Sequence, residues 1–144
     1  MTPHAFLTQA LSRWPAFGVE HVFLSRLNSG ILEADEVMAF VAEDFYLACA
    51  AVKGVSAAVS FVDGLLKAQF QSLGHFRLAA HELDEIRATL MQSLVVGGDG
   101  NRPRLERYLG RGPLAGWLRV VATREVITWL RSRARQPVAD DEAL

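Results

Sequence analysis

The sequence predicts an all-α protein, and three observations support this fold class. Nearly every set of apolar residues recurs at the three- and four-residue spacing of an amphipathic helix. Alternating β-branched runs bounded by turn pairs, which would indicate strands, are not found. The 144 residues are 51% hydrophobic with a net charge of −1, which is typical of a single folded globular domain. We therefore expect a compact multi-helix bundle with an N-terminal helical extension.

Residues 1–32 are predicted to form that extension, a helical hairpin that packs onto the main domain. Thr2-Pro3 is a good helix start, and Pro15 ends the helix that follows it. A second short helical segment, Val19–Leu27, stops at the turn signal Asn28-Ser29-Gly30.

Three helices are predicted next, over Glu33–Lys53, Val55–Leu73 and His81–Val96, and each is followed by glycine. Acidic residues crowd the start of the first and third of these helices, as the helix dipole prefers. The single cysteine, Cys49, lies in an apolar helical run. It is therefore expected to be a small buried core residue, and a disulfide within the chain is excluded.

The longest predicted helix runs from Pro113 to Arg135 and has two different faces. Steps of about 100° per residue place one set of apolar side chains on an arc that is expected to face the core: Leu114, Leu118, Val121, Ala122, Val126, Trp129 and Leu130. The opposite face carries Trp117, Val120, Ile127 and a stripe of Arg124, Thr128, Arg131 and Arg135. A basic face with aromatic neighbours favours a nucleic-acid partner. The alternative is a solvated surface whose late arginines complement the helix dipole.

Charge is segregated along the chain. Between Arg102 and Arg135 there are nine arginines against two glutamates, a net charge of +7, whereas residues 1–101 carry a net charge of −5. This asymmetry predicts two surfaces with different partners. The planar fork of Arg suits phosphates and base edges, although high genomic G+C content would give the same preference for Arg. Residues 137–144 are expected to be an acidic, frayed tail.

Sequence motifs of common enzymes are not found: there is no P-loop, GxGxxG, nucleophile elbow or CxxC. His75 and His81, with the acids near them, lack a recognised metal-ligand spacing, so we expect a solvated surface there. We expect a protein that is not an enzyme and that needs no metal or cofactor. Neither a signal peptide nor a membrane-length apolar run is found, so the expected location is cytoplasmic.

Three stretches carry a family likeness: DFYLACAAVKG (Asp44–Gly54), DEIRATLMQSL (Asp84–Leu94) and YLGRGPLAGWLRVVATREVITWLRSRAR (Tyr108–Arg135). Their order and content resemble region 2 of bacterial sigma-70-type RNA polymerase sigma factors, particularly the extracytoplasmic-function kind. The second stretch is similar to the family's polymerase-binding helix, D-x-V-Q-E-x-F-x-x-x-[YW]. The third is similar to its F-R-G…F-x-x-W-L-x-x-I-A-x-N…L-x-x-x-R-R stretch. On this likeness residues 33–136 are assigned to a sigma region 2-like helical domain.

The resemblance implies a transcription initiation factor domain with two partners. One is core RNA polymerase, whose β′ clamp helices would meet a set of residues on the second stretch: Asp84, Arg87, Ala88, Met91 and Gln92. The other is promoter DNA, with the unpaired non-template strand of the −10 element captured by a basic set: Arg104, Arg107, Tyr108, Arg111, Trp117, Arg124, Thr128, Arg131 and Arg135. At Trp117 the family position also fits core packing, and both alternatives stay open. An anti-sigma protein is a further candidate partner, and no membrane contact is expected.

Several positions depart from the family pattern. Arg87-Ala88 stands where Gln-Glu is usual, Arg124 stands where Asn is frequent, and the connector from Val95 to Tyr108 is long and rich in glycine. The family's second domain, a helix-turn-helix for the −35 element, has no counterpart in these 144 residues. These departures favour an alternative function, a degenerate sigma-like protein–protein module that regulates transcription without promoter melting.

Overall fold

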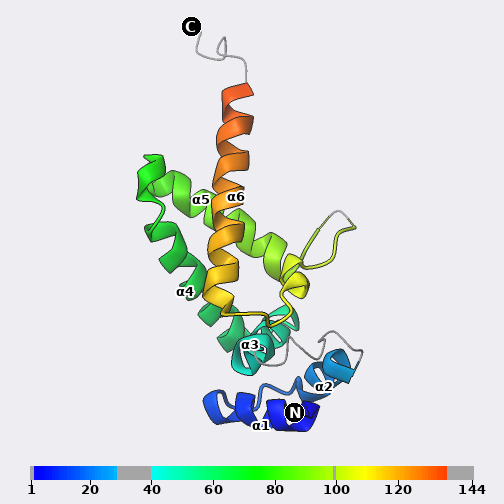
Figure 1. Cartoon of the computed structure of the whole chain (residues 1–144). Helices are drawn as coiled ribbons and strands as arrows, with labels where there is room; N and C mark the ends of the chain where they lie inside the picture. Colours follow the sequence, from blue (N-terminus) through cyan, green and yellow to red (C-terminus); the bar gives the residue numbers. More distant parts are fainter. Residues whose placement is uncertain (1, 29–39, 99, 136–144) are drawn as a thin grey trace, which may run out of the picture.

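The computed structural model describes residues 2–28, 40–98 and 100–135, and these ranges contain helices and no strand (Figure 1). Two of the elements, η2 and η3, are short 3-10 helices and the rest are α-helices. In chain order they are α1 (Pro3–Arg13), α2 (Glu20–Asn28), α3 (Ala42–Val52), α4 (Ser56–Gln71), η2 (Gly74–Phe76), α5 (Ala80–Val95), η3 (Arg104–Arg107) and α6 (Leu114–Arg135). The predicted fold class, an all-α helical bundle, is confirmed.

Helix α3 lies at the centre of the bundle. Every residue from Phe45 to Ala51 is buried, because α1, α2, α4, α5 and η3 all pack against this one helix. Its alanines and Cys49 let the neighbouring helices approach closely on all sides. Cys49 is 2% exposed, as expected for a small core residue.

The N-terminal hairpin of α1 and α2 packs on α3 and shares the main core, to which it contributes Phe6, Ala10, Phe23 and Leu27. Partly buried hydrogen bonds add to this packing. The Tyr46 hydroxyl donates to Glu20 Oε1 (2.8 Å) and accepts the N–H of Phe17 (2.8 Å). Trp14 Nε1 donates to the Glu43 carbonyl (3.0 Å). Thr2 caps α1 as its sequence predicts, accepting the N–H of Ala5.

The helix predicted over Glu33–Lys53 is wrong at Phe40 and Val41, and residues 33–39 lie outside the described ranges. Val41 is extended, and its N–H donates to the Gly110 carbonyl (2.8 Å), while Phe40 forms an isolated antiparallel bridge with Arg111. Gly110 has φ +76°, and a Cβ there would collide with the Phe40 ring. This pairing with a distant loop overrides the local helical pattern and delays the start of α3 until Ala42.

Helix α6 begins at Leu114, whose N–H donates to Asp44 Oδ2 on α3 (2.8 Å). A side chain seventy residues earlier in the chain therefore caps the longest helix. The first five residues of the predicted core arc are buried, and Trp129 and Leu130 are half-buried. The last turns of α6 extend past the other helices in Figure 1, and residues 131–135 are all exposed.

Candidate nucleic-acid interface

A groove of about 270 Å³ lies between η3 and the first half of α6. Its lining combines three guanidinium groups with an indole and two valines: Arg104, Arg107, Trp117, Val120, Val121 and Arg124. Four of the predicted strand-binding residues thus meet around one hollow, although they come from two separate elements. Val120, which the site prediction omitted, is 48% exposed at its edge.

The groove is positively charged. Arg104 is held by Glu125 of α6, with 3.1 Å between Nη1 and Oε1, and both side chains are about 30% exposed. Within the described part of the chain Arg107 and Arg124 make no ion pair, and both are exposed. One of the three arginines is therefore fixed by an internal carboxylate, and the other two are available for an external anion.

Trp117 takes part in both arrangements that the sequence left open, core packing and the candidate strand-binding surface. Its ring packs on Tyr108, with centroids 5.8 Å apart and planes inclined at 59°, while another part of the side chain lines the groove. An indole that packs on a core ring and also lines a basic groove is a suitable platform for a base.

Tyr108 does not lie on this surface, which corrects the prediction that it contacts the strand. It is 1% exposed, and its hydroxyl donates to the Gly112 carbonyl (2.6 Å). Burial raises the pKa of this phenol, with Asp44 and Glu43 as smaller causes in the same direction. Tyr108 therefore supports Trp117 from below, and no base can stack on it in this conformation.

The other residues that were predicted to bind the DNA strand are exposed but lie outside the groove. Thr128, Arg131 and Arg135 continue along the outer face of α6, and Arg135 lies about 16 Å from Arg124 at the usual rise per residue. Arg111 is exposed in the segment between η3 and α6, where its backbone forms the isolated bridge with Phe40. Thr128, Arg131 and Arg135 therefore extend the polar and basic surface from the groove toward the end of α6.

A second groove, of about 390 Å³, lies between α4 and α5 and shares no residue with the first. Four of the five predicted polymerase-facing residues line it: Arg87, Ala88, Met91 and Gln92. The fifth, Asp84, is exposed, and its Oδ1 lies 3.7 Å from Arg87 Nη2. Val59, Val95 and Val96 add apolar surface, and Val96 is 61% exposed.

Arg87 is not presented freely in this groove. Its Nη1 lies 2.6 Å from Asp63 Oδ1 on α4, and its buried Nε has no hydrogen-bond partner among the described residues. The contribution of α4 (Val59, Ser60 and Asp63) was missed by the sequence analysis. An acidic residue on the exposed side of one predicted helix, with an arginine on the next, was the available signal.

In the ranges that the structure describes, no three His, Cys, Asp or Glu side chains gather as a metal site. No single described helix is long and apolar enough to cross a membrane, and only the sharply bent pair α3–α4 passes by length and composition. Comparison with protein-family models, with curated proteins and with solved structures found no match.

Proposed function

We propose that this chain is a transcription initiation factor domain that captures unpaired promoter DNA in the groove between η3 and α6. The observation that supports this most directly is the meeting of Arg104, Arg107, Trp117 and Arg124 around one hollow. Guanidinium groups beside a half-open aromatic ring are the components of a single-strand platform, in which phosphates and bases are bound together. The apolar side chain of Val120 in the groove lining suits the flat face of an unstacked base.

The groove between α4 and α5 is proposed to dock a helix of core RNA polymerase. An apolar floor with polar and charged edges is the arrangement that accepts an amphipathic partner helix. Two separate grooves, one basic and one largely apolar, agree with the charge segregation of the sequence and with the two partners that the sigma-like motifs imply.

The polymerase half of the proposal is tested by titrating core RNA polymerase with the purified chain and with two matched variants. Ala88 and Ala68 are both exposed on helices, but only Ala88 lines the groove. We expect Ala88→Arg to weaken binding at least about tenfold, because it inserts a long cation where the partner helix would pack, and Ala68→Arg to bind like the wild type. If the folded wild-type chain fails to bind polymerase, this half of the proposal is wrong.

The second candidate function is a protein–protein module that retains the helix groove without strand capture. The ion pair between Arg87 and Asp63 favours it, because it engages a position where the family pattern usually has glutamine. This second function is supported if the chain binds polymerase but its affinity for single-stranded DNA does not depend on Arg107 and Arg124.

A further inference from the structure

A third hollow, of about 400 Å³, lies on the other side of η3, where α2, the end of α3 and the segment before η3 meet. Three cationic side chains from these three parts of the chain line it, together with one carboxylate and apolar walls: Arg26, Lys53, Arg102, Glu106, Val22 and Val52. None of these residues belongs to the candidate nucleic-acid groove. Its volume falls in the range of small-molecule sites, roughly 300–1,000 Å³.

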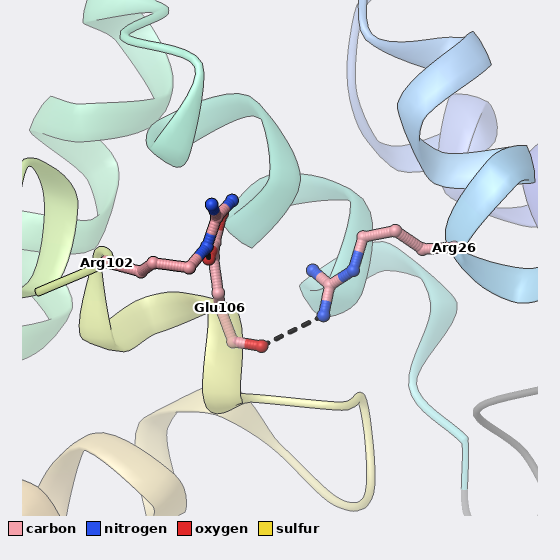
Figure 2. Close-up of polar contacts among 3 residues, drawn as sticks. All are labelled: Arg26, Arg102 and Glu106. Carbon is pink, nitrogen blue, oxygen red and sulfur yellow. Dashed lines mark hydrogen bonds and ion pairs between the residues drawn. The ribbon is translucent and has the colours of Figure 1, made fainter. Parts of the chain in front are cut away.

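Contacts with Glu106, Phe45 and Cys49 help to hold Arg26 in place at this hollow. Figure 2 shows its side chain reaching from α2 to the main-chain carbonyl of Glu106, which accepts from Nη2 at 2.9 Å. Its guanidinium carbon lies 4.6 Å from the centroid of the Phe45 ring, and Nη1 lies 3.9 Å from Cys49 Sγ. A half-buried guanidinium oriented in this way loses little freedom when it binds an additional anion.

The other two cations are exposed. Arg102 is 82% exposed and makes a two-pronged pair with Glu106, with its Nε 2.6 Å from Oε1 and its Nη2 3.0 Å from Oε2. Lys53 is exposed directly after α3. The carbonyls at the end of α3 are already bound by the amides of Lys53, Gly54 and Val55, which reduces their repulsion of an anion in the hollow.

The electrostatics of Glu106 show that these cations act on one place. The pKa of Glu106 is lowered, first by its hydrogen bond with Arg102 and then, against the effect of burial, by the charges of Arg102, Arg26 and Lys53. One internal carboxylate therefore feels all three cations. Among the residues that the structure describes, the lining has three cations and one carboxylate, a formal charge of +2.

We propose that this hollow binds a phosphate group, with Arg26 as the fixed anchor and Lys53 and Arg102 closing on the phosphate oxygens. A phosphate monoester dianion would complement the cations of this lining, and the valines would contact the apolar part of the molecule that carries it. The phosphate can belong to a small molecule or to a nucleic-acid strand that crosses η3. This hollow shares no lining residue with the candidate nucleic-acid groove, so the two sites can be tested separately.

The chain itself provides the assay, because its only two lysines are Lys53 in the hollow and Lys67 on the exposed side of α4. Acylation of both lysines is followed by mass spectrometry with and without inorganic pyrophosphate. We expect pyrophosphate to slow the acylation of Lys53 at least about threefold relative to Lys67, and the Arg26→Gln variant to lose this protection. Arg102→Gln, at an exposed side chain, should weaken the protection without affecting the fold, and it serves if Arg26→Gln proves unstable.

A single-stranded oligonucleotide forms the second arm of the experiment. Selective protection of Lys53 by pyrophosphate supports a site for a free phosphate compound. Protection by the oligonucleotide alone supports a phosphate site whose phosphate comes from a nucleic-acid strand. Equal acylation of the two lysines with both probes, or protection that persists in the Arg26→Gln and Arg102→Gln variants, overturns the proposal.

Discussion

The most decisive test of the candidate nucleic-acid interface is the removal of its two unpaired cations. We predict that the double variant Arg107→Gln/Arg124→Gln binds single-stranded DNA more weakly and with a smaller dependence on salt. Glutamine keeps much of the length and polarity of arginine and introduces no negative charge, so the change isolates the electrostatic contribution. Arg104 is left in place because its pair with Glu125 would confuse the interpretation.

The magnitude follows from counterion release. Each phosphate neutralised on a single strand contributes a slope of about 0.7 in the logarithm of affinity against the logarithm of salt concentration. Two lost contacts should therefore reduce the slope by about 1.4, and at about 0.1 M salt they should weaken binding roughly 25-fold, about fivefold for each arginine. Both side chains are exposed, so the free energy of unfolding should change by less than about 0.5 kcal/mol.

The assay is fluorescence anisotropy of a labelled oligonucleotide over a series of salt concentrations. The control is Arg77→Gln/Arg119→Gln, which removes the same charge from exposed positions outside the groove. If the two double variants lose affinity and slope equally, binding depends on net charge and the groove has no special role. If neither loses any, the assignment of the basic face is wrong.

Two further predictions concern how the scaffold holds these sites. Asp44→Ala should destabilise the protein by about 1 kcal/mol, seen as a lower melting temperature, because it removes the acceptor for the first amide of α6, whereas Asp44→Asn should lose less. Burial raises the pKa of Tyr46 to about 12, so folding favours the neutral phenol. The stabilisation that comes from the raised pKa of Tyr46 is fully present below the ordinary pKa of about 10 and is lost as the pH rises toward 12. Urea titrations across this range should show an alkaline loss of stability that becomes smaller in Tyr46→Phe; an unchanged profile would contradict the reasoning.

The helices could be predicted from the sequence because helical periodicity is local. The apolar arc of α6 and its basic opposite face depend only on the rotation of successive residues, and both occur as expected. The start of α3 could not be predicted, since it depends on the pairing of Val41 with Gly110, far away in the chain. The ion pair of Arg87 with Asp63 and the convergence of Arg26 with Arg102 likewise join different elements, so helical periodicity alone does not predict them.

The incorrect prediction for Tyr108 has a physical cause in η3, and the same cause explains how one short segment serves two cationic sites. A 3-10 helix has three residues per turn, so residues three apart share a side. Arg104 and Arg107 therefore line the groove together, while Leu105 and Tyr108, 0% and 1% exposed, anchor the segment in the core.

Glu106 occupies the third side of η3 and lies in the other hollow, where it meets Arg102. Successive residues of a 3-10 helix point about 120° apart. Arg107 and Tyr108 are therefore neighbours in the sequence but lie on different sides of the segment. Because the two buried anchors fix the rotation of η3, the position of Glu106 on one side is coupled to the positions of Arg104 and Arg107 on the other. A ligand that draws Arg102 away from Glu106 would act directly on the segment that presents Arg104 and Arg107 to a strand.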